Sequence, residues 1–439
     1  MSLSSNIGDG ILRLFFRLAA IGYGNPPDHR SIAPRLGSLQ RSIDIFQGKI
    51  PALYPYLRGG HDATTELENR CLQIEGGRGA VAVASGQAAN SLVLDGLLQG
   101  GGRILVSKLI FGGTIPMIEL KARIYGAEIV YVDPTDVGEI KRLTTPETKA
   151  IFLESLSNPG GIAAPVAEIA AVANERHVAL VVDNTLGISL SRPLAEGAHI
   201  VTSSLTKYAN GHNSEIGGMI VVGEKAPWLE QEKVAPFRFP FFSGELPRTS
   251  RNPTAIASAA EVVARLRKLA VLYGTTPSIN SARTILRHLR TISQRLKKQQ
   301  ANAQLIANFL ASASEVTDVR FPGNGFDLAN DERVRRYFPN GAGSIITFDL
   351  NGGKAAAAAF VDQLNRDGLI THRANLGQKW TMATWPWGTT HIQLTEEEKK
   401  NAGITEGTIR LSVGVENPRL LKLALARAIK ARILSAPAP

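Results

Sequence analysis

The stretch from Val178 to Val222 reads VALVVDNTLGISLSRPLAEGAHIVTSSLTKYANGHNSEIGGMIVV, and it is the most informative part of the chain. Within it, the apolar run VALVVD ends in Asp183, and Lys207 follows directly after the run HIVTSSLT. Short apolar runs separated by longer segments are typical of the buried strands of a parallel sheet. Ligands of such a sheet bind outside the carboxyl ends of its strands, so the acid and the amine are expected to face one site.

An aspartate, a lysine and nearby hydroxyl groups at one sheet edge suit pyridoxal phosphate. This cofactor needs a lysine for its Schiff base, a carboxylate to hold its ring nitrogen protonated, and hydroxyl and backbone N–H groups for its phosphate. Ser204 and Thr206 precede Lys207 in SSLTK and can supply the hydroxyls. Taken singly, such a lysine is more often a solvated surface residue, and such an aspartate a turn or helix cap. The aspartate, the lysine and the hydroxyls together therefore indicate a pyridoxal phosphate site more strongly than either charged residue does alone.

The composition indicates a soluble protein with more than one domain. The chain has 439 residues, of which 44% are hydrophobic and 20% charged, and single cores rarely grow beyond about 250 to 300 residues. No apolar run reaches the roughly 18 residues that a membrane-spanning helix needs. The net charge of +11 favours anionic ligands, but basic and aromatic residues do not interleave as in a nucleic-acid platform.

Three further features bear on location and packing. The single cysteine, Cys71, cannot form an internal disulfide and is expected to be packed on a helix. Ile11 to Ala19 carry apolar residues at helical spacing together with Arg13 and Arg17, which favours a docked amphipathic helix over a targeting signal. The basic run from Arg287 to Lys298 is expected to be a solvated helix face. We expect a cytoplasmic protein.

Strand-like runs alternate with helical segments from about residue 80 to 222. The aromatic- and proline-bearing segment between Gly223 and Ser250 is expected to be an ordered loop or lid. Helices follow to about Ala313, and the rest mixes strands with helices. The sequence thus predicts an α/β protein with a large, mainly parallel sheet domain and a smaller C-terminal α+β domain, with the site in the cleft between them.

Several motifs in order resemble those of the Cys/Met-metabolism class of pyridoxal-phosphate enzymes. They are YLRGG with Tyr56 and Arg58, ASGQAAN with Ser85, Gly86 and Gln87, ESLSNPGG with Asn158, SSLTK, and GTIRLSVGVEN with Arg410. The resemblance runs from about Tyr54 to the C-terminus, and the segments SGQAA, FGGT and TTHIQLTEEEKKNAGI are most similar to O-acetylhomoserine sulfhydrylases.

The resemblance implies an aspartate-aminotransferase-like fold, known as fold type I, and a role for each matched residue. Lys207 is the catalytic residue, and Arg410 and Asn375 bind the amino-acid substrate. The cofactor-binding residues are Tyr56, Arg58, Ser85, Gly86, Gln87, Phe111, Asn158, Asp183, Ser204, Thr206 and Lys207. Tyr56 and Arg58 are expected to reach the cofactor phosphate of a neighbouring subunit in a homodimer or homotetramer. The implied domains are an N-terminal arm at 1–60, a cofactor-binding domain at 61–272 and a small domain at 273–439, without a metal site.

The chain departs from this pattern near the substrate. Phe111 stands where relatives have a tyrosine stacked on the cofactor ring, and Asn375 stands in place of a serine. Trp385 and Trp387 replace a His-Pro and small residues. We interpret the two tryptophans either as a platform that stacks an adenine or another heteroaromatic ring, or as packing for a loop.

The implied reaction is a γ-replacement on an activated homoserine-type amino acid, such as O-acetylhomoserine or S-adenosylmethionine. A γ leaving group is expelled to give a vinylglycine-type intermediate, to which a second, nucleophilic substrate is added. A carbon nucleophile at this step would form a carbon–carbon bond, as in specialised metabolism. A phenyl ring at Phe111 offers no proton to an anionic leaving group, whereas a sulfonium leaves as a neutral thioether. The alternatives are a β- or γ-lyase acting on one substrate and a noncatalytic binding protein that retains the fold.

Overall fold

The computed structural model describes residues 38–46, 56–224, 259–323, 328–392 and 394–435, and it divides into the units Met1–Thr65 and Glu66–Pro439. The helix expected near Ile11 and most of the lid expected between Gly223 and Ser250 lie outside the described residues. In the first unit, α2 spans Leu39–Phe46 and a short 3-10 helix, η2, spans Leu57–Gly59. The Arg58 guanidinium lies 5.7 Å from the centre of the Tyr56 ring.

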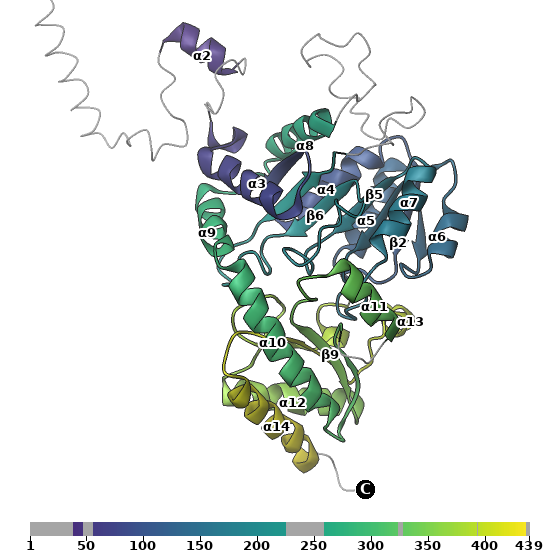
Figure 1. Cartoon of the computed structure of the whole chain (residues 1–439), viewed down its shortest axis with the longest axis vertical. Helices are drawn as coiled ribbons and strands as arrows, with labels where there is room; N and C mark the ends of the chain where they lie inside the picture. Colours follow the sequence, from purple (N-terminus) through teal and green to yellow (C-terminus); the bar gives the residue numbers. More distant parts are fainter. Residues whose placement is uncertain (1–37, 47–55, 225–258, 324–327, 393, 436–439) are drawn as a thin grey trace, which may run out of the picture. The chain divides into compact units, whose positions relative to one another are not determined.

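A seven-stranded sheet forms the larger part of the second unit (Figure 1). Its strands are β1 (Gly79–Val83), β2 (Gly102–Ser107), β3 (Ala127–Val132), β4 (Thr148–Glu154), β5 (Ala179–Asp183), β6 (Ile200–Ser204) and β7 (Gly218–Val222). The spatial order is β1-β7-β6-β5-β4-β2-β3. Only β7 runs antiparallel to its neighbours, and the strands from β6 to β3 are parallel. The mainly parallel sheet predicted from the sequence is therefore confirmed.

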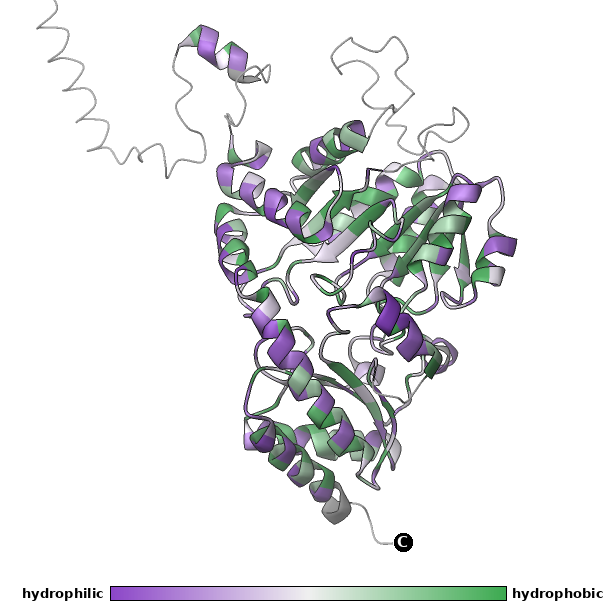
Figure 2. Ribbon diagram, viewed as in Figure 1, coloured by the Kyte–Doolittle hydropathy of each residue, from purple (hydrophilic) through white to green (hydrophobic). Residues whose placement is uncertain are grey.

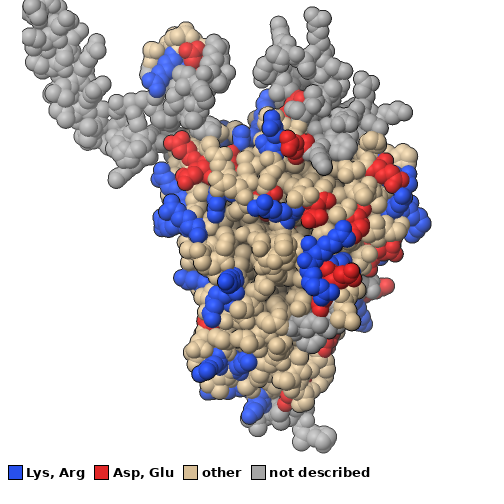
Figure 3. Space-filling view, viewed as in Figure 1, with Lys and Arg blue, Asp and Glu red and all other residues tan. Residues whose placement is uncertain are grey.

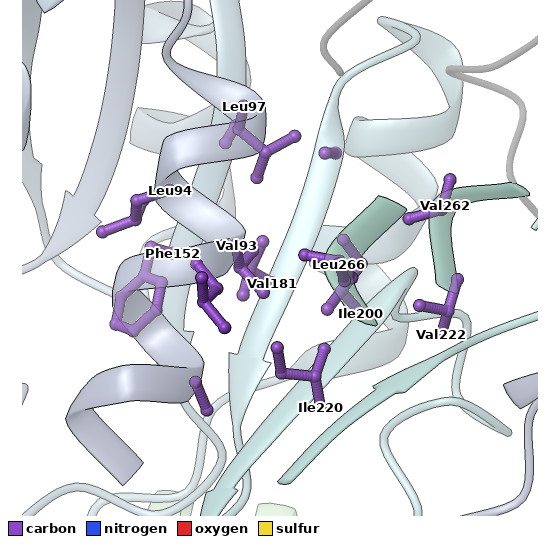
Figure 4. Close-up of a cluster of buried hydrophobic side chains, with 14 of the residues drawn as sticks. Val93, Leu94, Leu97, Phe152, Val181, Ile200, Ile220, Val222, Val262 and Leu266 are labelled. Atoms are coloured by element: carbon purple, nitrogen blue, oxygen red, sulfur yellow. The ribbon is translucent and has the colours of Figure 1, made fainter. Parts of the chain in front are cut away.

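Helices cover both faces of this sheet, because the strands are apolar on both sides. They are α3 (Asp62–Glu75), α4 (Gly86–Leu97), α5 (Ile115–Tyr125), α6 (Val137–Leu143), α7 (Val166–Glu175) and α8 (Ala259–Tyr273). Side chains of α4 and α8, such as Leu94 and Leu266, pack with Phe152 and Ile220 of the sheet (Figure 4). A separate cluster joins α6 and α7 to the sheet. Figure 2 shows the apolar strands enclosed between helices whose outer faces are more hydrophilic.

A five-stranded sheet, in the order β10-β11-β12-β9-β8, forms the smaller part. Its elements, after the connecting helices α9 (Ile279–Leu289) and α10 (Ile292–Ala311), are β8 (Val316–Arg320), α11 (Leu328–Tyr337), β9 (Ile345–Leu350), α12 (Gly353–Asp367), β10 (Thr371–His372), β11 (Met382–Thr384), η5 (Pro386–Gly388), α13 (Glu396–Asn401), β12 (Thr408–Ser412) and α14 (Pro418–Ser435). Buried residues of α10, α12 and α14 pack on this sheet. The fold class predicted from the sequence is thus confirmed, while the boundaries at 60/61 and 272/273 stay predictions.

Several expectations about the core and the surface can be compared with the structure. Cys71 is buried in α3, as expected. The basic run from Arg287 to Lys298 lies on α9 and α10, whose apolar side chains, including Leu289 and Leu296, are buried. Acidic and basic side chains share the face seen in Figure 3. Among the described residues, no helix has the length and apolar character needed to cross a membrane.

Candidate active site

A cavity of about 220 Å³ lies where the carboxyl ends of β4, β5 and β6 meet the N-terminus of α4 and segments of the smaller part. The side chains of Glu154, Asp183 and Ser204 end these three strands. The complete lining is Ser85, Gly86, Gln87, Asn90, Phe111, Thr114, Glu154, Leu156, Asn158, Asp183, Thr185, Leu186, Ser204, Thr206, Lys207, Ile216, Ala374, Asn375, Leu376, Thr390 and Arg410. The topology therefore brings residues far apart in the sequence into one site.

One end of the cavity is built to bind an anion. Ser85 caps α4 by accepting a hydrogen bond from the Ala88 N–H at 3.1 Å. The N–H groups of Gly86 and Gln87 fall in the first turn of α4, where backbone donors have no partner within the helix and attract negative charge. A side chain at Gly86 would place its Cβ 2.7 Å from the Ser204 Cβ, so glycine permits this close approach. The Ser204 and Thr206 side chains line the same cavity.

Asp183 is a half-buried residue whose carboxylate is fixed in position by hydrogen bonds. Its Oδ1 accepts from the Thr185 hydroxyl at 2.5 Å and the Thr185 N–H at 3.0 Å, and its Oδ2 accepts from Asn90 Nδ2 at 3.1 Å. Burial raises the pKa of Asp183, while the donors from Thr185 and Asn90 oppose that rise. These bonds favour the ionised form that can bind a protonated ring nitrogen.

Lys207 is half-buried beside the smaller part. Its Nζ donates to Asn375 Oδ1 at 2.6 Å. Burial first, and the positive charge of Arg410 second, lower the pKa of Lys207 to about 8. A lysine amine with a pKa near the working pH can carry or accept a proton, and its neutral form is nucleophilic.

Arg410, on β12, is almost completely buried. It donates to Asn158 Oδ1 at 2.9 Å, to Thr384 Oγ1 at 3.2 Å and to the Asn375 carbonyl oxygen at 3.3 Å. Burial lowers the pKa of Arg410 to about 10, so the guanidinium stays charged at neutral pH. Its Nε is buried without a hydrogen-bond partner among the described residues. A buried cation without a carboxylate partner suits an anionic substrate group.

These donors and acceptors fit pyridoxal phosphate. The α4 N-terminus with Ser204 and Thr206 suits the phosphate, Asp183 suits the ring nitrogen, and Lys207 suits the aldehyde carbon. Among the described residues, no group of three or more His, Cys, Asp or Glu side chains is placed to hold a metal ion. Fold and site together define a fold type I pyridoxal-phosphate enzyme.

Comparisons with known proteins agree with the assignment as a pyridoxal-phosphate enzyme. Residues 36–430 match the family model described as Cys/Met metabolism PLP-dependent enzyme. The chain is 36% identical to O-acetyl-L-homoserine sulfhydrylase 1 of Thermus thermophilus, over 83% of this chain and 85% of that one.

Solved structures of enzymes are also similar to the structure of this chain. A putative O-acetylhomoserine (thiol)-lyase of Campylobacter jejuni that contains N′-pyridoxyl-lysine-5′-monophosphate has a TM-score of 0.82 and 29% identity, with 92% of this chain and 95% of that one covered. A cystathionine γ-synthase of Xanthomonas oryzae, in complex with cystathionine, has a TM-score of 0.77 and 27% identity, with 94% of each chain covered. The chain belongs to the Cys/Met metabolism family of PLP-dependent enzymes, and its cofactor is pyridoxal phosphate.

The structure brings most of the predicted site residues together. Of the residues predicted from the sequence, Ser85, Gly86, Gln87, Phe111, Asn158, Asp183, Ser204, Thr206, Lys207, Asn375 and Arg410 line the cavity. Their individual roles stay predictions. Tyr56 and Arg58 belong to the first unit, and their predicted contact with a neighbouring subunit also stays a prediction.

The two tryptophans do not line the described cavity. Trp385 packs against the core of the smaller part, and its Nε1 donates to the Glu406 carbonyl oxygen at 2.8 Å. Lys399 Nζ lies 4.8 Å from the centre of the Trp387 ring. Of the two interpretations given for these residues, the structure favours packing over a platform for an adenine ring.

Sequence reasoning missed the residues that support Asp183. Asn90 lies one helical turn after Gly86, so it shares the cavity-facing side of α4, a spacing that the sequence displays. Thr185 follows Asp183 by two residues, a separation at which aspartate commonly binds local donors. The contacts of Glu154 with the backbone of Phe111 and Asn158 depend on loop paths that the sequence does not display.

Proposed function

We propose that this enzyme catalyses γ-replacement on an activated homoserine-type amino acid, with a second substrate as the nucleophile. The observation that carries the proposal is that Lys207, Asp183 and Arg410 face one cavity beside a helix N-terminus suited to phosphate. The similar sulfhydrylase and γ-synthase support this reaction type for the family.

Each described residue would have a distinct task. When bound, pyridoxal phosphate supplies an electron sink for negative charge at the substrate Cα. Asp183 would hold the ring nitrogen protonated, and Arg410 would bind the substrate carboxylate through a paired hydrogen bond. Lys207 would remove the proton from Cα, since its lowered pKa allows a neutral amine near pH 8.

Among the described residues that line the cavity, no cation lies at the phosphate end. Lys207 and Arg410 are the only basic residues among its described lining, and both are placed near the substrate end by their contacts with Asn375. A dianionic phosphate bound by neutral donors alone lacks charge compensation. This supports the proposal that Tyr56 and Arg58 of a neighbouring subunit complete each site in a homodimer or homotetramer.

Phe111 bears on the leaving group. Its phenyl ring lines the cavity and has no hydroxyl to protonate an anionic leaving group. This supports a sulfonium substrate such as S-adenosylmethionine beside O-acetylhomoserine, but the tryptophans add no support because they lie outside the lining. The proposal that the second substrate is a carbon nucleophile is supported only by the altered residues near the substrate.

The test is to supply the loaded enzyme with each amino acid, with and without a thiol or carbon nucleophile. We expect release of acetate or methylthioadenosine together with a new γ-substituted amino acid. Formation of a 2-oxo acid and ammonia from one substrate, at the same rate with and without nucleophile, would instead establish a lyase. Absence of turnover with every amino acid, together with unchanged ligand binding in Lys207→Ala, would establish a noncatalytic protein.

A further inference from the structure

Two asparagines form a hydrogen-bonded chain that ends at the catalytic lysine. Lys207 Nζ donates to Asn375 Oδ1 at 2.6 Å, and Asn375 Nδ2 donates to Asn213 Oδ1 at 2.5 Å. We propose that Asn213 is a positioning residue, which turns the Asn375 amide so that only its oxygen faces Lys207. The inference rests on the proposed function in one respect, that Lys207 acts as the base.

The orientation of the Asn375 amide matters because its two ends have opposite hydrogen-bonding character. The oxygen only accepts hydrogen bonds and the NH₂ group only donates them. An oxygen facing Lys207 binds an N–H of the amine and leaves the nitrogen lone pair free to take a proton from the substrate. A reversed amide would donate into that lone pair and reduce the basicity of Lys207. Asn213 Oδ1 disfavours the reversal, since it accepts only from the NH₂ end.

The backbone at Asn213 is fixed where the side chain begins. Asn213 has a φ of 53°, in the left-handed region that asparagine tolerates better than most residues. Its N–H donates to Gln378 Oε1 at 2.5 Å. The fully buried Gln378 also donates to the carbonyl oxygens of Leu376 at 3.1 Å and Thr206 at 3.4 Å. Gln378 thus ties the segment that follows Lys207 to the segment that carries Asn375.

We expect the Asn213 side chain to contribute little to the stability of the fold. A positioning role can therefore be tested separately from a structural role. The Asn213 side chain is exposed, so water can replace its partner when it is removed. Lys207, in contrast, is half-buried, and its pKa of about 8 makes a substantial share of the amine neutral near that pH. The orientation of the Asn375 amide, which Asn213 sets, therefore decides whether the lone pair of this amine is free to take a proton.

The decisive variant is Asn213→Gly, because glycine keeps the left-handed backbone without strain. The measurement is exchange of the α-hydrogen of L-norvaline in deuterated water, which needs a base but no γ leaving group. We expect exchange to slow about tenfold, a fraction of the effect of a general base. Asn213→Asp, whose carboxylate only accepts hydrogen bonds, should keep the rate within about threefold of the wild type.

Ser214→Ala is the matched control, since Ser214 bonds to Asn210 Oδ1 and not to the pair. A second readout uses the protein without cofactor, in which Lys207 is acylated with acetic anhydride over a range of pH and followed by mass spectrometry. Asn213→Gly should lower the pH at which Lys207 becomes reactive, with an unchanged melting temperature.

Exchange by Asn213→Gly at the wild-type rate, an unmoved acylation profile, or equal slowing in Ser214→Ala would each overturn the role of Asn213. Failure of the Asn213 proposal can be distinguished from failure of the proposed γ-replacement. A wild-type enzyme that exchanges the α-hydrogen of L-norvaline but forms no γ-substituted product contradicts γ-replacement and leaves the positioning role intact.

Discussion

Glu154 and Asp183 are paired at the carboxyl ends of the adjacent parallel strands β4 and β5, and both carboxyl groups line the cavity. Their partners differ. Asp183 accepts side-chain donors from Thr185 and Asn90, whereas Glu154 accepts the backbone N–H groups of Phe111 at 2.7 Å and Asn158 at 3.1 Å. Burial, followed by the charge of Asp183, raises the pKa of Glu154 well above its usual value. The negative charge of the pair therefore resides on Asp183.

Replacing Asp183 by asparagine removes that charge and keeps the size of the side chain. We expect kcat to fall about 10²- to 10³-fold, because an ionised group that stabilises charge in the transition state is lost. Steady-state kinetics of the loaded Asp183→Asn enzyme measure the effect, with the melting temperature as a check on folding. A kcat within about twofold of the wild type would remove Asp183 from the catalytic account.

Arg410→Lys tests the binding of the substrate carboxylate. Lysine keeps the positive charge but cannot form the planar paired bond of a guanidinium, and it releases Asn158 and Thr384. We expect KM for the amino acid to rise about tenfold to a hundredfold, from the loss of charged hydrogen bonds. Arg333→Lys, at a cation whose Nε donates to the Ala163 carbonyl oxygen, is the control. An unchanged KM would contradict the assignment.

Phe111→Tyr adds a phenol to the cavity. If the natural leaving group is an anion such as acetate, kcat/KM should rise, because the hydroxyl can donate a hydrogen bond worth about 0.5–1.5 kcal/mol. If it is a neutral thioether, the added hydroxyl should bring no gain. Release of acetate and of methylthioadenosine by wild type and variant, compared side by side, decides between the two leaving groups.

Glu75 gives the folded protein a dependence on pH. It is fully buried at the end of α3, and its two oxygens accept from Asn184 Nδ2 at 3.0 and 3.1 Å. Burial raises the pKa of Glu75 from 4.5 to about 8. The folded state therefore holds a proton that the unfolded state releases between these values, so the free energy of unfolding falls as pH rises through this window.

Urea unfolding checks this dependence. The wild type should lose stability from pH 4.5 toward pH 8, and Glu75→Gln should show a smaller loss over the same window. Parallel pH dependences in both proteins would show that Glu75 is ionised when folded.

Much of the large sheet and its ligand-facing edge could be predicted from the sequence, because the strands are short apolar runs that end in polar residues. Asp183, Ser204 and Lys207 follow from that pattern and from the local motif SSLTK. The contact between Lys207 and Asn375 could not be predicted, because 168 residues separate them and the path of the smaller part decides whether they meet. Trp385 was ambiguous for a related reason, since an indole suits a ligand platform and a protein core equally.

Lys207 is the lysine expected to carry pyridoxal phosphate. The loaded enzyme is reduced with borohydride, digested, and analysed by mass spectrometry to locate the pyridoxyl group. We expect the group on the peptide containing Lys207, and we expect it to be absent from Lys207→Ala. A pyridoxyl group on another lysine of the wild type, or none on Lys207, would contradict it.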